Sequence, residues 1–155
     1  ACVAQIVNII SWLQTRRDGL LVQTSFYPFK LVSTLARGNA LDVLTKAPIV
    51  ETPKYGGVSA LDVSASHDPA TGKQAIFIVN RSQTDTINTE LNWQSAAPNG
   101  VGEVWQLAGT DLKAANTWEN PNAITAKQLS NVVVKDGKVA LQLPPLSFTA
   151  VSVNG

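Results

Sequence analysis

Hydrophobic and polar positions follow two different patterns along the chain. Residues 3–10 form an almost continuous apolar run, rich in Val and Ile, that contains no charged residue. Such a run is typical of a strand buried on both faces of a parallel sheet. A short helix is the competing interpretation, but β-branched residues at five of these positions favour a strand. The sequence therefore predicts a buried strand over residues 3–10.

A polar loop and a helix are predicted next. Asp18-Gly19 marks a turn inside the loop SWLQTRRDG. Apolar residues then recur at helical spacing over 26–37, between Ser25 as a candidate N-cap and Gly38 as a candidate C-terminal glycine. The first 38 residues thus form one βα unit. A lone parallel strand leaves its edges and apolar faces without partners, so we expect most of its sheet to lie outside this chain.

After Gly38 the period changes to that of β-strands. Short runs such as TINTELNW (86–93) alternate between apolar and polar residues, and Gly, Pro, Asn or Asp separate them. Asp136-Gly137 predicts a tight hairpin, and Pro144-Pro145 predicts a break before the last strand. Six to eight such strands indicate an antiparallel β-sandwich or jelly roll over residues 39–155.

Composition and charge narrow the kinds of partner. The chain is 45% hydrophobic and 15% charged, with a net charge of +1, so it has no basic surface for nucleic acid or an anionic membrane. No apolar run reaches the roughly 18 residues of a membrane span. The single cysteine, Cys2, is predicted to be a small core residue, and no Cys/His cluster has metal-ligand spacing. We expect no nucleic acid, membrane, metal or cofactor partner.

The sequence contains two candidates for acid/base chemistry, a possible carboxylate pair and a single histidine. Asp111 and Glu119 share one loop and could form a carboxylate pair, but a solvated loop rich in turn formers is the favoured interpretation. His67 is the only histidine, and the turn formers around it favour a surface turn over a catalytic base. No Gly-x-Ser-x-Gly motif accompanies it.

Two amides and two tryptophans are the remaining candidates for ligand contact. Burying an unpaired amide costs about 1–3 kcal/mol, so the side-chain amides of Gln5 and Asn8 on a buried strand need hydrogen-bond partners. They either close a local polar network, or one points into a ligand site; the residues alone leave both open. Trp12 and Trp118 fall in loops and could stack on a sugar, although loop tryptophans usually anchor the loop.

Six segments, in order, resemble the C-terminal part of glycoside hydrolase family 51, the α-L-arabinofuranosidases. They are ACVAQIVNII, QTSFYPFKLVSTLARG, LDVSAS, IFIVNRS, LAGTDLKAANTWENPN and LPPLSFTAVSV. The resemblance implies a mainly β chain, in which a jelly-roll β-sandwich follows the last βα unit of a (β/α)8 barrel whose remainder lies outside this chain. Residues 1–38 would hold the final strand and helix of the catalytic barrel, and residues 39–155 would be the sandwich.

The same resemblance implies a function. Family members are retaining enzymes that remove terminal non-reducing arabinofuranosyl residues from arabinoxylan, arabinan and oligosaccharides, using two glutamates about 5 Å apart. Those glutamates precede everything in this chain, so no catalytic residue is assigned here and the segment alone is expected to be inactive. The family's Ala-Gln-hydrophobic-Val-Asn motif matches AQIVN (4–8) and implies that Gln5 binds the arabinose, while Asn8 is expected to be structural.

The expected partners are an arabinose-containing polysaccharide or oligosaccharide and the missing N-terminal barrel portion, on the same or a separate chain; the oligomeric state stays open. Low charge and the sequon Asn80-Arg81-Ser82 suggest an extracellular protein, with a cytoplasmic one as the alternative. The alternative function is a non-catalytic carbohydrate-binding or structural β-sandwich module.

Overall fold

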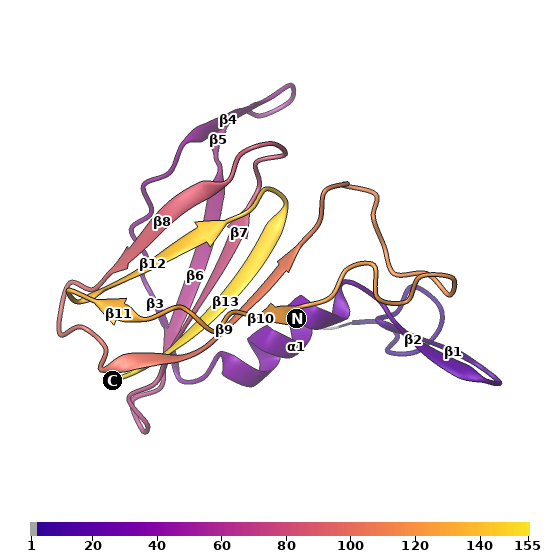
Figure 1. The fold of residues 1–155 in the computed structure, drawn as a ribbon, viewed down its shortest axis with the longest axis horizontal. Helices are drawn as coiled ribbons and strands as arrows, with labels where there is room; N and C mark the ends of the chain where they lie inside the picture. Colours follow the sequence, from indigo (N-terminus) through magenta and orange to yellow (C-terminus); the bar gives the residue numbers. More distant parts are fainter. Residues whose placement is uncertain (1–2) are drawn as a thin grey trace.

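The computed structural model describes residues 3–155, which form thirteen strands and one helix (Figure 1). The elements are β1 (Leu13–Arg16), β2 (Gly19–Val22), α1 (Phe26–Leu35), β3 (Asn39–Leu41), β4 (Ile49–Thr52), β5 (Gly56–Ser59), β6 (Leu61–His67), β7 (Gln74–Asn80), β8 (Ile87–Asn92), β9 (Gly100–Ala108), β10 (Lys127–Gln128), β11 (Val134–Lys135), β12 (Lys138–Leu143) and β13 (Ser147–Asn154).

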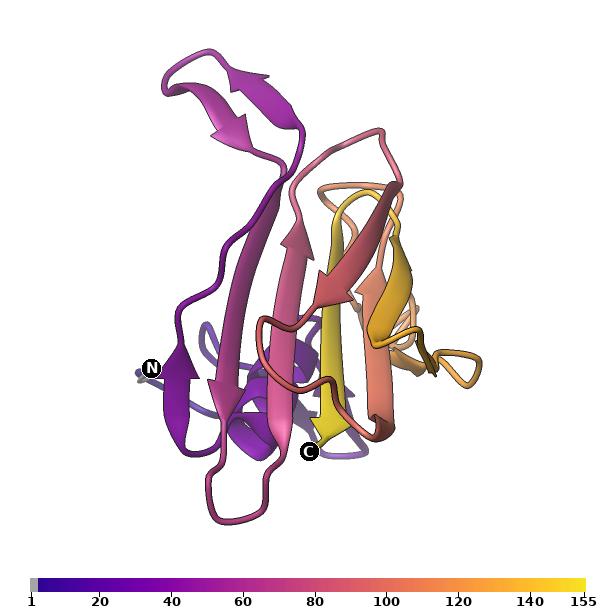
Figure 2. The same ribbon diagram turned by 90° about the vertical axis from the view of Figure 1, so that its left-hand side faces the viewer.

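The strands form two main sheets and two hairpins. One sheet has six strands in the order β10-β9-β13-β7-β6-β3, and the other has three in the order β11-β12-β8. Every strand pair in the described residues is antiparallel. The hairpins β1–β2 and β4–β5 extend from the body of the sheets (Figures 1 and 2). The prediction of a mainly β, antiparallel chain is confirmed.

The main core lies between the two sheets. In β12 every second residue is buried, which places Val139, Leu141 and Leu143 on one face. These side chains pack with Ile78 and Val151 of the six-stranded sheet. In β8 the alternation predicted from TINTELNW is present, because its odd-numbered residues are partly buried and its even-numbered ones exposed. The two sheets therefore pack face to face, as apolar sheet faces require.

Leu143→Ala should destabilise the protein because Leu143 is fully buried at the centre of this core. Loss of a leucine side chain with incomplete collapse of the cavity costs about 2–5 kcal/mol of unfolding free energy. Urea denaturation measures that loss directly. Leu112→Ala is the matched control, since Leu112 is 67% exposed and its truncation should change the free energy by less than about 0.5 kcal/mol. Equal effects from the two variants would show that the core is assigned wrongly.

Helix α1 covers the opposite face of the six-stranded sheet. Leu31 packs on Ala75, Phe77 and Ala150 of the two central strands, so β7 and β13 are covered on both faces. The helix was expected over 26–37 and ends at Leu35.

The two ends of α1 differ in how far the predictions hold. Arg37 donates hydrogen bonds to the carbonyl oxygens of Ser33 and Ala36, which stabilises the carbonyl end of the helix. Gly38 has φ +73°, but the C-cap is Ala36, so Gly38 lies one residue beyond the C′ position predicted for it. The prediction that Ser25 caps the N-terminus is wrong, because Ser25 has helical angles and makes no side-chain cap hydrogen bond.

In this chain by itself, residues 3–10 do not form the buried strand predicted for them. Only a single bridge, between Val7 and Leu13, occurs there, and Asn8 and Ile10 have positive φ angles that interrupt an extended backbone. Ile9 and Ile10 are 68% and 95% exposed. The physical reason is that, within the described part of the chain, only Leu13 of β1 shares backbone hydrogen bonds with the segment, through Ile6 and Asn8. Cys2 lies outside the described residues.

Three predicted turns can be compared with the structure. The polar loop expected after residue 10 is a hairpin, β1–β2, whose turn residues are Arg17 and Asp18. Asp136-Gly137 joins β11 to β12 with positive φ at both residues, and the backbone breaks between β12 and β13 at Pro144-Pro145, so these two predictions are confirmed. In residues 3–155 no helix has the length and apolar character needed to cross a membrane.

Candidate functional site

Gln5 lies on the exposed segment that precedes β1 and makes no hydrogen bond within residues 3–155. Asn8, three residues later, closes a local polar network. Its side-chain oxygen accepts hydrogen bonds from the backbone amide of Thr15 at 2.8 Å and from the Thr15 hydroxyl at 3.1 Å. The backbone amide of Asn8 donates to the Leu13 carbonyl at 2.7 Å. Asn8 therefore holds the segment against β1, which leaves Gln5 as the amide free for a ligand.

The two loop tryptophans are held by neighbours within the chain. The ring of Trp12 lies 3.8 Å, centroid to centroid, from that of Phe29 in α1. The guanidinium of Arg16 sits over the ring of Trp118, 4.0 Å from its centroid, which is a cation–π distance. Both side chains are half-buried, so each anchors its loop, as loop tryptophans usually do.

The connection between β9 and β10, residues 109–126, contains a buried amide. Asn116 is 2% exposed and donates from Nδ2 to the carbonyl oxygens of Val22, at 2.9 Å, and Ile124, at 3.0 Å. Its Oδ1 accepts the Ile124 amide at 2.8 Å. This side chain ties the 109–126 connection to the end of β2. Nothing in the sequence indicates this role of Asn116, because an asparagine in a polar loop carries no sign of burial.

Asp111 and Glu119 do not form an acid/base pair. Asp111 accepts a hydrogen bond from the Lys113 amide at 2.8 Å within its own turn. Hydrogen bonds from the backbone and from Thr117, aided by the charge of Arg16, lower the pKa of Glu119. A general acid at neutral pH needs a raised pKa, so the exposed Glu119 carboxyl does not suit that role.

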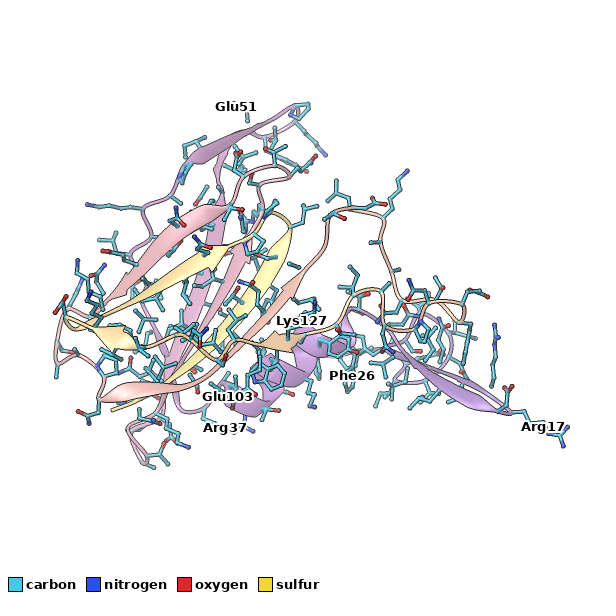
Figure 3. All side chains as sticks on the ribbon, in the orientation of Figure 1. Arg17, Phe26, Arg37, Glu51, Glu103 and Lys127 are labelled. Atoms are coloured by element: carbon cyan, nitrogen blue, oxygen red, sulfur yellow. The ribbon has the colours of Figure 1, made fainter. Side chains whose placement is uncertain are left out.

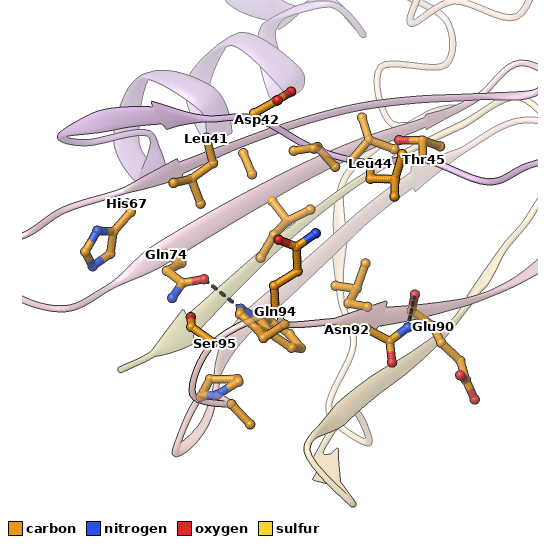
Figure 4. A pocket seen from close by; sticks show the side chains of 18 of the residues that line it. Leu41, Asp42, Leu44, Thr45, His67, Gln74, Glu90, Asn92, Gln94 and Ser95 are labelled. Atoms are coloured by element: carbon orange, nitrogen blue, oxygen red, sulfur yellow. Dashed lines mark hydrogen bonds between the residues drawn. The ribbon is translucent and has the colours of Figure 1, made fainter.

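His67 is the last residue of β6 and stands before a tight turn. The Thr71 hydroxyl and the Ala70 amide donate to Asp68 in that turn, and these bonds lower the pKa of the Asp68 carboxyl. A groove of about 900 Å³ between the sheets is lined in part by His67, Gln74 and Trp93 (Figure 4). Gln74 accepts the Trp93 indole N–H at 2.7 Å. Within the described residues no carboxylate hydrogen-bonds to His67.

The remaining glutamates are dispersed. Glu51 lies on the β4–β5 hairpin and Glu103 on β9, and the two are far apart in Figure 3. Glu90 is paired with Lys138 at 3.0 Å, and Glu103 accepts the Trp105 indole N–H. A retaining glycosidase needs two carboxyl groups about 5 Å apart, and the separation of Glu51 from Glu103 does not meet that need. Residues 3–155 hold no group of three His, Cys, Asp or Glu side chains that could bind a metal ion.

The sequon asparagine, Asn80, is buried. It is 1% exposed, and its Nδ2 donates to the carbonyl oxygens of Asp85, Leu143 and Pro144, each at 2.9 Å, while its Oδ1 accepts the Ser82 amide. Glycosylation requires an accessible side-chain amide on the surface. In the folded protein Asn80 is a structural residue that joins β7 to the β12–β13 turn.

Known proteins similar to this chain are arabinofuranosidases. An intracellular exo-α-(1→5)-L-arabinofuranosidase of Streptomyces lividans is 33% identical over 97% of this chain, and an exo-α-(1→6)-L-arabinofuranosidase of Bifidobacterium longum is 32% identical over 99%. A solved family 51 α-L-arabinofuranosidase from Bifidobacterium longum aligns with a TM-score of 0.89 at 28% identity, over 97% of this chain and 30% of its own.

The match covers nearly all of this chain and a minor part of each relative. The chain spans 23% and 30% of the length of the two curated relatives. The family described as "Alpha-L-arabinofuranosidase C-terminal domain" matches residues 1–147. The resemblance to the C-terminal part of family 51 enzymes is thereby confirmed, and the chain belongs to the α-L-arabinofuranosidase C-terminal domain family.

Proposed function

We propose that this chain is the C-terminal part of a retaining α-L-arabinofuranosidase, which hydrolyses terminal non-reducing arabinofuranosyl residues from arabinan, arabinoxylan and their oligosaccharides. The observation that carries the proposal is the family match over residues 1–147. The relatives named above are exo-acting arabinofuranosidases, which supports the terminal position of the bond that is cleaved. The catalytic glutamates lie in the remainder of the enzyme.

Residues 1–38 contribute the final strand and helix of a (β/α)8 catalytic barrel. The apolar side chains of residues 6–10 support this proposal, because Ile6, Ile9 and Ile10 are each more than 60% exposed in the chain by itself. Neighbouring barrel strands would cover these side chains and share the backbone hydrogen bonds of the segment. Residues 39–155 form the jelly-roll β-sandwich that follows the barrel.

Gln5 binds the arabinofuranosyl group in the proposed enzyme. Its primary amide both donates and accepts hydrogen bonds, which suits a sugar hydroxyl. Support comes from the structure around it, since Asn8 is committed to Thr15 and Leu13 while Gln5 stays available on an exposed segment. In a barrel, side chains at the carboxyl ends of strands face the substrate.

The sandwich, residues 39–155, braces the barrel. A carbohydrate-binding module would present several exposed aromatic rings in one plane, whereas each of the four tryptophans has a partner inside the described chain. No observation therefore favours the carbohydrate-binding alternative.

The enzyme acts inside the cell. The Streptomyces lividans relative is named as intracellular, and so is a Bacillus subtilis relative. Burial of Asn80 removes the sequon that had favoured secretion. The sequon therefore no longer supports the extracellular prediction, and the names of these two relatives favour the cytoplasmic alternative.

Hydrolysis of 4-nitrophenyl α-L-arabinofuranoside tests the proposal. The intact enzyme, meaning the longer protein that contains this chain, should release nitrophenol, and the purified 155 residues should release none above the buffer blank. The matched 4-nitrophenyl α-L-arabinopyranoside serves as a control for ring size. Turnover by the 155 residues alone, or inactivity of the intact enzyme on the furanoside, would contradict the proposed function.

A further inference from the structure

We infer that Asn116, a sandwich residue, is a positioning residue for the glycosidase reaction: the 109–126 connection holds the β1–β2 hairpin, and the hairpin holds the segment that carries Gln5. The inference rests on the proposed function, because it assumes that Gln5 binds the sugar. It adds a role for the sandwich in substrate binding, although none of its side chains touches the substrate.

The first contact is the buried amide. The Nδ2 group of Asn116 uses both of its hydrogens, one on Val22 of β2 and one on Ile124 of its own connection. Because Asn116 is 2% exposed, truncation would leave these carbonyl oxygens and the Ile124 amide without partners in a site with little access for water. The contact therefore fixes the distance between the connection and the end of β2.

The second contact lies at the other end of the hairpin. Arg16 stacks over Trp118, and a Cβ atom on Gly19 would come within 3.3 Å of the same indole ring. Gly19 thus permits the close approach of the ring to the hairpin backbone. Together the two contacts hold both strands of the hairpin against the 109–126 connection, which reaches over β1 and β2 in Figure 1.

Backbone contacts lead from the hairpin to the segment that carries Gln5. Leu13 lies opposite Val22 across β1 and β2, and beside this pair the Gln23 amide donates to the Trp12 carbonyl at 2.8 Å. Leu13 in turn donates to the Ile6 carbonyl at 3.3 Å and accepts the Asn8 amide at 2.7 Å. Ile6 is the residue next to Gln5, so the position of the Gln5 backbone depends on the position of the hairpin.

A hydrogen bond to a sugar contributes to catalysis only when the side chain is held at the productive distance. Displacement of a binding group by about 1 Å can cost about 10²-fold in rate. A two-stranded hairpin has marginal stability by itself, so an external support has a clear physical purpose. The 109–126 connection supplies that support.

A double-mutant cycle in the intact enzyme tests the inference. Asn116→Ala should lower kcat/KM on 4-nitrophenyl α-L-arabinofuranoside about 10-fold, after correction for the folded fraction. In the Gln5→Ala background the same substitution should lower it less than about 2-fold, because the group that it positions is already absent. A merely structural residue would show equal losses in both backgrounds. Asn122→Ala, an exposed asparagine of the same connection, should leave kcat/KM unchanged.

Asn8→Gly provides the second variant in case Asn116→Ala does not fold. Glycine accepts the positive φ of this exposed position, and the substitution deletes only the two hydrogen bonds from Thr15. The same dependence on Gln5 is expected. Equal losses in both backgrounds, or no loss with Gln5 present, would overturn the inference and leave the proposed function intact. An unchanged kcat/KM in Gln5→Ala itself would overturn the inference together with the assignment of Gln5.

Discussion

Gln5→Ala should lower kcat/KM of the intact enzyme on arabinofuranosides by about 30- to 900-fold. This corresponds to the loss of about 2–4 kcal/mol of transition-state stabilisation, as expected for a hydrogen-bonding group removed from a closed, water-poor site. Gln5 has no hydrogen-bond partner in residues 3–155, so its truncation should leave the melting temperature nearly unchanged. Steady-state kinetics and thermal unfolding of the same samples separate the two effects.

Gln83→Ala is the matched control for this substitution. Gln83 is also an exposed glutamine, but it lies in the turn between β7 and β8, within the sandwich. Its variant should retain the kcat/KM of the unmodified enzyme. A Gln5→Ala enzyme that matches the Gln83→Ala enzyme would remove Gln5 from the substrate site, whereas a fall in stability with unchanged kinetics would assign Gln5 a structural role.

The sequence predicts best where local patterns alone decide the structure. The alternation in TINTELNW places Ile87 and Leu91 on the buried face of β8, because a strand has a side-chain period of two. Asp136-Gly137 produces its hairpin because the pair accepts positive φ at both positions. The helical spacing after Ser25 likewise locates α1 to within two residues at its C-terminal end.

The sequence predicts poorly where the structure depends on distant parts of the chain. Asn116 bonds to Val22, 94 residues earlier, and nothing in the loop sequence records that contact. The pairing of Trp118 with Arg16 is equally remote. The candidate site showed the same limit: Gln5 was found through a family motif, while the residues that support it are visible only in the fold.

Residues 3–10 show the limit most clearly. Their apolar pattern describes a buried strand, but burial requires neighbours, and the described chain offers only the bridge from Val7 to Leu13. Ile6, Ile9 and Ile10 therefore face solvent in a segment without charged residues. Apolar side chains grouped in this way usually mark a surface that another part of a protein covers. The central claim is that the remaining barrel strands of the intact enzyme cover it.

Amide hydrogen exchange in the intact enzyme tests that claim most directly. If residues 3–10 hydrogen-bond to neighbouring barrel strands, the amides of a peptide that covers them should exchange about 10³-fold more slowly than those of the exposed loop 94–97, and at a rate near that of β7. In the 155 residues alone the same peptide should exchange as fast as that loop. Fast exchange of residues 3–10 in the intact enzyme would show that no strand pairs with them, and would contradict their assignment to a catalytic barrel.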